Sequence, residues 1–111
     1  MLFRSIGQVD DLPPSVCASL YRIAQEAITN AAKHAQAGHV QLRLEAGSAD
    51  IVLSVEDDGK PTGGDLAPKA GMGLLGMLER VASLGGTLRF ERRITGGATL
   101  LATIPNMGPG S

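Results

Sequence analysis

Apolar residues recur at helical spacing along residues 15 to 35. They stand three or four positions apart, which is typical of a helix that buries one stripe of its surface. The stripe consists of Leu20, Ile23, Ala24, Ala27, Ile28 and Ala31. Because proline is tolerated in the first turn and glycine often follows the last, Pro13 and Pro14 predict the start and Gly38 the end. We predict a helix from Ser15 to Ala35.

The same spacing returns between Gly73 and Leu84, where we predict a second helix. Its apolar positions are Leu74, Met77, Leu78, Val81 and Leu84. The pair Gly85-Gly86 follows directly and predicts the end of this helix.

Four other stretches alternate apolar and polar residues, which is the pattern of strands with one buried face. They cover residues 40–44, 51–55, 88–90 and 100–104. Short connections join the first two and the last two of these stretches, so we predict two antiparallel hairpins. Residues 2–9 contain good strand formers with poor alternation and predict one further strand.

The resulting order is strand, helix, hairpin, loop, helix, hairpin. Each strand has one apolar face, and both helices can cover that face, which predicts a two-layer α/β sandwich with a mixed, mostly antiparallel sheet. We assign residues 1–105 to this single domain. Residues 106–111 are rich in glycine and proline and are expected to form a disordered tail.

Composition narrows the range of functions. The net charge of -1 gives no global field that would attract nucleic acid or anionic lipid, and one tyrosine and two phenylalanines offer no base-stacking platform. No apolar run reaches membrane-spanning length, so we expect no direct membrane contact. The lone Cys17, which we expect to be a packed thiol, excludes an internal disulfide and favours a reducing, cytoplasmic compartment.

Polar residues form a second stripe on the first helix. Glu26, Asn30 and Lys33 share the three- and four-residue spacing of the apolar stripe and lie about 100° from it, at the edge of the core. A carboxylate, an amide and an ammonium lined along a half-buried edge suit a metal ion and phosphates. The alternative is an ordinary amphipathic helix with a mixed polar rim.

Strand alternation also places Asp57. The apolar face that includes Val55 continues to Asp57, whereas Asp58 points the other way and Gly59 leaves room for a ligand. A carboxylate on the buried face needs a partner, because a buried unpaired charge is costly. A neutral amino group on a heterocycle would provide that partner, although an Asp-Gly turn is also a common structural feature.

The glycines between residues 71 and 76 spell G-x-G-x-x-G. With Glu91 downstream they would fit a dinucleotide site, but that motif should follow a strand directly and residues 67–70 do not form one. The remaining inference is that glycines at a helix start expose N–H groups that bind anions. The long loop over residues 58–72 is expected to act as a lid.

Taken together, these stretches resemble the catalytic, ATP-binding domain of bacterial sensor histidine kinases, which are Bergerat-fold ATPases. The chain is most similar to the subfamily of nitrate-sensor and desaturase-sensor kinases. The N-box match comprises Leu12-Pro13-Pro14, Tyr21-Arg22-Ile23, Gln25-Glu26-Ala27, Asn30 and Lys33-His34-Ala35. Residues 57–59 match the first glycine box and residues 71–86 the second. The resemblance covers Leu12 to Pro105 and implies the Bergerat fold.

The resemblance implies a role for each candidate residue. Asn30 would bind the Mg2+ that bridges the phosphates, Lys33 would reach the phosphates, and Asp57 would accept a hydrogen bond from the adenine amino group. Glu26 stands where related ATPases have an acid that orients a nucleophile or a metal-bound water, and it is the candidate catalytic residue. The implied nucleotide-binding residues are Asn30, Lys33, Asp57, Gly59, Gly71, Met72, Gly73 and Leu74.

Two positions depart from the family pattern. Pro61 stands where the first glycine box usually has its second glycine, so that turn is stiffer here. Ala98 stands where a hydroxyl residue often holds a water near the adenine. Thr99 is adjacent but faces the other way by alternation. These departures bear on adenine affinity and leave the predicted fold unchanged.

The resemblance also implies partners. The chain would bind Mg-ATP and present the γ-phosphate to a histidine on a separate helical hairpin domain of its parent kinase, and a response regulator would act downstream. The parent would be homodimeric through that hairpin domain and can be membrane-anchored, whereas this domain is expected to be cytoplasmic and to bind no nucleic acid.

Two other functions fit the same sequence. One is a stand-alone anti-sigma-type serine kinase of the same fold, although the segment Lys33-His34-Ala35 fits the sensor subfamily better. The other is a degenerate domain that only docks a partner, with Pro61 and Ala98 as signs of decay. Intact Asn30 and Asp57 argue against that second alternative.

Overall fold

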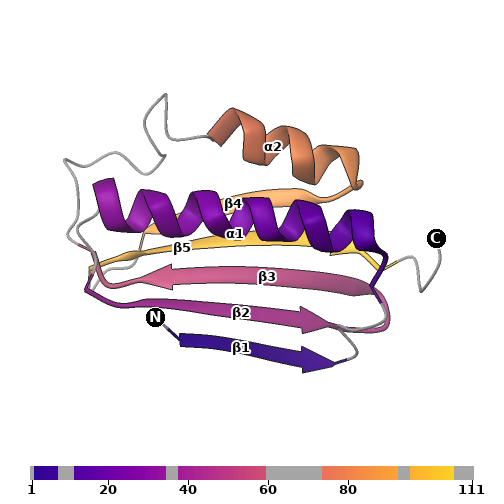
Figure 1. Ribbon diagram of the computed structural model, residues 1–111, viewed down its shortest axis with the longest axis horizontal. Helices are drawn as coiled ribbons and strands as arrows, with labels where there is room; N and C mark the ends of the chain where they lie inside the picture. The colour runs from indigo at the N-terminus through magenta and orange to yellow at the C-terminus, as the bar shows by residue number, and fades with distance from the viewer. Residues whose placement is uncertain (1, 8–11, 35–37, 60–73, 93–95, 107–111) are drawn as a thin grey trace.

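The computed structural model describes residues 2–7, 12–34, 38–59, 74–92 and 96–106. These residues form one five-stranded sheet with α1 and α2 on the same face (Figure 1). The strands are β1 (Leu2–Gly7), β2 (Val40–Ala46), β3 (Asp50–Asp57), β4 (Thr87–Arg92) and β5 (Ala98–Pro105), and the helices are α1 (Pro14–His34) and α2 (Leu74–Ser83).

The sheet has the strand order β1-β2-β3-β5-β4. The edge strand β1 runs parallel to β2, and all other neighbouring strands are antiparallel. This arrangement confirms the predicted two-layer sandwich with a mixed, mostly antiparallel sheet, including the strand at the N-terminus. Strand β3 lies at the centre and pairs with β2 on one side and β5 on the other.

The start of α1 agrees with the sequence prediction to within one residue. The carbonyl of Pro13 accepts the first backbone hydrogen bonds, from the N–H groups of Val16 at 3.0 Å and Cys17 at 3.1 Å. Pro14 is the first helical residue, where its missing N–H costs nothing. The prediction that Cys17 is a packed thiol is wrong: its side chain is exposed, because Val16 supplies the core contact at this turn.

The end of α2 is a glycine cap, as the sequence predicted. Gly85 adopts a φ of 75°, which only glycine accepts at low cost. Its N–H donates to the carbonyl of Ala82 at 3.0 Å, and the N–H of Gly86 donates to the carbonyl of Val81 at 2.9 Å. These two bonds satisfy carbonyls that the helix end would otherwise leave unpaired.

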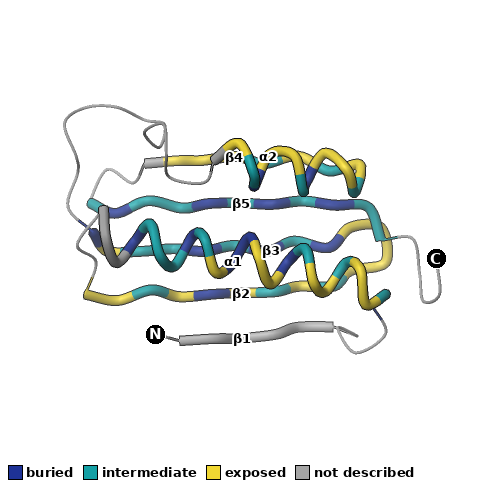
Figure 2. Tube along the Cα trace, turned by 45° about the horizontal axis from the view of Figure 1, so that its top comes forward, coloured by how far each residue is buried: buried dark blue, intermediate teal, exposed yellow. Residues whose placement is uncertain are grey.

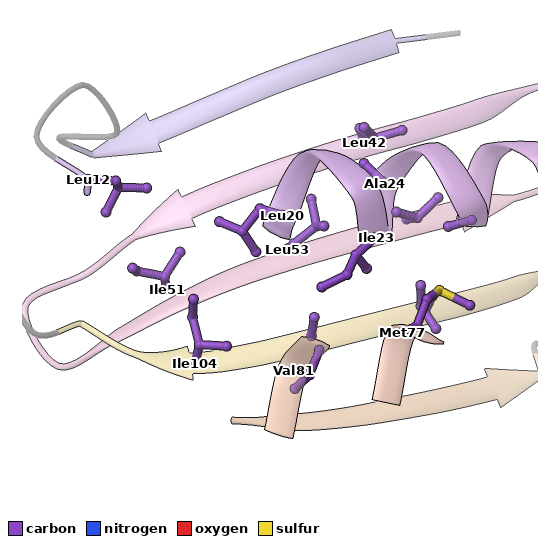
Figure 3. Close-up of a cluster of buried hydrophobic side chains, with 14 residues drawn as sticks. Leu12, Leu20, Ile23, Ala24, Leu42, Ile51, Leu53, Met77, Val81 and Ile104 are labelled. Atoms are coloured by element: carbon purple, nitrogen blue, oxygen red, sulfur yellow. The ribbon is translucent and has the colours of Figure 1, made fainter. Parts of the chain in front are cut away.

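The core lies between the two helices and the inner face of the sheet (Figure 2). Figure 3 shows its side chains converging from both layers. The most completely buried members are Ile23, Ile51, Met77, Val81 and Ile104. The predicted stripe of α1 is confirmed, because all its residues are buried except Ile28, which is partly buried and packs against the core.

The predicted apolar stripe of α2 is too wide. Met77 and Val81 are each 1% exposed, but Leu78 is 43% exposed. Leu78 follows the buried Met77 directly, and consecutive helical residues point about 100° apart, so Leu78 turns away from the core.

Asn106 is the only described residue of the predicted tail. Its backbone N–H donates to the carbonyl of Ala49 at 2.9 Å, and its side-chain amide donates to the carbonyl of Gly47 at 2.7 Å. Both bonds attach the end of β5 to the turn between β2 and β3. Residues 107–111 lie outside the described part of the chain, so the tail stays a prediction.

A buried glycine, Gly97, fixes the backbone at the end of the sheet where β3 ends and β5 begins. Gly97 precedes β5 and has a φ of 88°, and a Cβ at this position would collide with the carbonyl oxygen of Asp57 and lie 3.2 Å from the Cα of Asp58. Gly96 has a φ of 104°, but the nearest atom to its Cβ would be the carbonyl oxygen of Gly59 at 3.8 Å. Of these two glycines, only Gly97 combines a positive φ with a close approach.

We expect Gly97→Ala to destabilise the domain more than Gly96→Ala. Both substitutions force an L-residue to a positive φ, at about 1–3 kcal/mol each. Gly97→Ala adds a steric collision with β3, for a further loss of about 1–3 kcal/mol. Urea unfolding of both variants measures the difference, and equal losses would show that the close approach has no energetic weight.

Candidate nucleotide site

Several element ends meet at one end of the sheet. Helix α1 and strand β3 both end there, and α2 begins there (Figure 1). Strand β5 also begins there, because its antiparallel register sets Ala98 opposite Asp57. Asn30 near the end of α1 and Asp57 at the end of β3 are therefore brought to the same end of the domain.

Glu26 and Asn30 lie on α1 at the border between the core and the solvent. Both side chains are half-buried, whereas Ala27 beside them is buried. Their predicted position at the edge of the core is confirmed. The backbone of Lys33 lies in the last turn of α1, but its side chain is outside what the structure describes.

Asp57 lies where strand alternation predicted. It follows the buried residues Leu53 and Val55 on the same face of β3 and is itself half-buried. Its Oδ1 accepts a hydrogen bond from the N–H of Gly59 at 2.9 Å, and Gly59 is buried. This local bond orients the carboxylate and leaves further acceptor positions on its two oxygens.

The register of β5 settles the faces of Ala98 and Thr99. The pairing between β3 and β5 runs without a bulge, so Ala98 lies opposite Asp57 and Thr99 opposite Glu56. Thr99 therefore faces away from Asp57, as predicted, and Ala98 is the β5 residue beside the carboxylate. A methyl group provides no hydrogen bond there.

The structure contains an interaction beside the site that the sequence interpretation missed. Asp58, predicted to point away from the buried face, is exposed and bound to His39. Its Oδ1 accepts a hydrogen bond from the His39 N–H at 2.8 Å, and its Oδ2 lies 3.0 Å from the His39 Nδ1. These bonds hold the pKa of Asp58 below its usual value of 3.8, first through the backbone N–H of His39 and then through its ring.

The signal for this pair was the strand register. Val40 lies opposite Asp57, so one step further along the antiparallel pair sets His39 opposite Asp58. Strand alternation placed Asp58 on the outward face of its strand but did not pair it with His39 across the sheet. The contact of Gly97 with Asp57 was also missed, because it depends on the shape of the turn before β5.

Part of the predicted site lies outside the described residues. Gly71, Met72 and Gly73 belong to this group, as do residues 60–72 of the lid predicted over residues 58–72. Leu74 is described by its backbone alone, as the first residue of α2. The alternative of a dinucleotide site gains no support, because Oε1 of Glu91 forms an ion pair with a guanidinium nitrogen of Arg89 at 2.8 Å.

Within the described part of the chain, no group of three or more His, Cys, Asp or Glu side chains could hold a metal ion. The described helices also include none that is long and apolar enough to cross a membrane.

Comparison with known proteins assigns the chain to a family. The sequence model of the family described as "Histidine kinase-, DNA gyrase B-, and HSP90-like ATPase" matches residues 16–107. That range includes α1 from its third residue on, both glycine-containing segments and the closing strand β5. The match therefore covers every candidate residue predicted from the sequence.

Individual relatives are a signal transduction histidine kinase and a sensor protein. The chain is 34% identical over 103 residues to the signal transduction histidine-protein kinase/phosphatase DegS of Brevibacillus brevis, covering 93% of this chain and 27% of that protein. It is 33% identical over 97 residues to the nitrate/nitrite sensor protein NarX of Escherichia coli, covering 83% of this chain and 16% of that protein. The chain thus spans about a quarter or less of these two relatives.

A solved structure extends the likeness to the fold. The blue-light activated histidine kinase EL346 of Erythrobacter litoralis superimposes with a TM-score of 0.75 and 29% sequence identity, covering 94% of this chain and 37% of that one. The chain belongs to the family of histidine kinase-, DNA gyrase B- and HSP90-like ATPases, as an ATP-binding catalytic domain of the sensor histidine kinase type.

Proposed function

We propose that this domain binds Mg-ATP between the end of β3 and the last turns of α1, and presents the γ-phosphate to a histidine on a separate domain. The observation that carries the proposal is the pair of half-buried polar side chains, Asp57 and Asn30, on two elements that end at the same end of the sheet. Family membership supports ATP as the ligand.

The adenine end is assigned to Asp57. Adenine presents an exocyclic amino group, which donates hydrogen bonds, and a carboxylate accepts them. Because Asp57 is half-buried and already oriented by the Gly59 N–H, its remaining acceptor positions have a fixed direction. A hydrogen bond to a charged acceptor in this environment contributes about 1.5–3 kcal/mol.

The phosphate end is assigned to α1 and the start of α2. The amide oxygen of Asn30 is a hard ligand that suits Mg2+, which proteins typically hold through few side chains plus substrate phosphates. Glu26, one turn earlier on α1, would orient the nucleophile or a metal-bound water. Among the described residues, no group of three or more His, Cys, Asp or Glu side chains could hold a metal ion, which fits a site where the phosphates supply the other ligands. Mg2+ would neutralise phosphate charge, while Lys33 and the N–H groups at the start of α2 would bind phosphate oxygens.

Phosphoryl transfer then depends on a nucleophile from outside this chain. In-line attack requires the accepting atom opposite the leaving oxygen of the γ-phosphate. His39 is 89% exposed but its ring is bound to Asp58, and it belongs to the adenine end of the site. We assign the accepting histidine to a helical hairpin domain of a homodimeric parent kinase in the cytoplasm, with a response regulator as the final acceptor.

We expect Asp57→Asn to weaken ATP binding at least about fivefold, and Asp58→Asn to change it much less. An asparagine at position 57 can present a donor to the adenine amino group and leave a mismatch of about 1–3 kcal/mol. The amide that Asp58→Asn introduces would keep an acceptor oxygen for the His39 N–H. Calorimetric titration with ATP compares the two isosteric variants, and equal losses would show that Asp57 is not the adenine ligand.

We expect Asn30→Ala to abolish most of the dependence of ATP affinity on Mg2+. The substitution deletes an oxygen ligand without adding bulk to the half-buried edge of α1. ATP titrations with Mg2+ and with a chelator give the ratio of affinities for each protein. Thr29→Ala, one position along the same helix, is the matched control, and a wild-type ratio in Asn30→Ala would exclude the metal role.

We expect the isolated chain to bind ATP without labelling itself on histidine. Labelled phosphate from γ-labelled ATP should appear only after a helical hairpin domain with an accessible histidine is added. Acid lability and mass spectrometry identify the modified residue. Stoichiometric phosphohistidine at His34 or His39 of the isolated chain would overturn the two-domain mechanism.

A further inference from the structure

We propose that His39 is a positioning residue for the adenine carboxylate: it holds Asp58, and through Asp58 it fixes Asp57. This inference rests on the ATP-binding function proposed above, but part of it is testable without any nucleotide. We call the hydrogen bonds between His39 and Asp58 the His39–Asp58 latch.

The latch consists of three hydrogen bonds between two residues that are nineteen positions apart in the chain. The backbone N–H of Asp58 donates to the carbonyl of His39 at 3.2 Å. The His39 N–H donates to Oδ1 of Asp58 at 2.8 Å, and Nδ1 lies 3.0 Å from Oδ2. Since a carboxylate only accepts, Nδ1 carries the proton in this contact. Both carboxylate oxygens are thereby engaged by one residue.

The glycine turn before β5 holds the other side of the peptide that joins Asp57 to Asp58. The backbone of Gly97 packs directly against the carbonyl of Asp57, so closely that no Cβ would fit. The segment from Asp57 to Asp58 therefore lies between His39 on the β2 side and Gly97 on the β5 side. A peptide held from both sides loses much of its freedom to rotate.

Fixing this peptide fixes the carboxylate of Asp57. The strand ends at Asp57, so beyond it no further strand pairing restrains the backbone, and the latch and the glycine turn take over that role. The bond from the Gly59 N–H to Oδ1 of Asp57 spans the Asp58 peptide, and it persists only while Asp58 keeps its conformation. The His39 side chain is exposed and is not part of the buried core, so His39 can be replaced without disturbing the core.

The first experiment needs no nucleotide. Amide hydrogen exchange is measured at Gly59, whose N–H reports the orientation of the Asp57 carboxylate, and at Gly47, whose N–H donates to the Asp50 carbonyl at 2.8 Å at the other end of β3. We expect His39→Ala and Asp58→Ala each to speed exchange at Gly59 about fivefold, the effect of losing roughly one hydrogen bond, with no change at Gly47.

The variants also test coupling. If His39 acts through Asp58, the double variant changes Gly59 exchange no more than the larger single variant does. Asp58→Asn keeps an acceptor oxygen for the His39 N–H, so it should restore much of the protection that Asp58→Ala loses. Arg89→Ala removes the exposed ion pair with Glu91 and is the matched control.

The second experiment measures nucleotide selectivity. GTP presents a carbonyl oxygen where ATP presents an amino group, so a well-oriented Asp57 carboxylate favours ATP and repels GTP. We expect His39→Ala to lower the ratio of ATP affinity to GTP affinity several-fold, whereas a general loss of stability would leave that ratio unchanged in the folded protein.

The outcomes separate the two proposals. Fast Gly59 exchange in both single variants supports the latch even if the wild-type domain binds no ATP, a result that would refute only the proposed function. Unchanged Gly59 exchange, equal acceleration at Gly47, or additive effects in the double variant would each refute the latch. An unchanged ATP-to-GTP ratio despite faster Gly59 exchange would refute its role in adenine recognition.

Discussion

The pairing of β3 with β2 on one side and β5 on the other determines where the site can form. Because side chains alternate along a strand, this register sends Ile51, Leu53 and Val55 into the core and carries Asp57 to the same face. A slip of one residue would move the carboxylate to the opposite face of the sheet. The position of Asp57, the proposed adenine ligand, is therefore fixed by the same contacts that fill the core.

The helix layer imposes a second constraint. The apolar stripe of α1 packs on the sheet, so the residues about 100° around the helix lie at the margin of the core, where water is partly excluded. Because water is partly excluded, a polar side chain at that margin interacts more strongly with a bound molecule, and it avoids the full free-energy cost of burial. Glu26 and Asn30 occupy this margin, and α2 begins at the same end of the sheet. The packing of one helix thus positions the two residues that we propose for the phosphate end of the site.

Local sequence patterns predicted the elements, the layer arrangement and the faces of Glu26, Asn30 and Asp57. Alternation placed Asp57, helical spacing placed Asn30, and a glycine pair marked the end of α2. The errors and omissions concern contacts between elements. The exposure of Cys17 and Leu78, the contact of Gly97 with Asp57, and the bonds between His39 and Asp58 all depend on how distant segments align. Spacing along a single element contains no information about that alignment.

The central claim is that the Asp57 end and the Asn30 end hold one nucleotide together with a metal ion. Isothermal calorimetry of the purified chain with ATP, in the presence of Mg2+ and again with the metal chelated, tests it most directly. We expect saturable binding of one ATP per chain, with clearly lower affinity once Mg2+ is removed. No saturable heat with ATP under either condition, from a chain that is folded by circular dichroism, would contradict the claim.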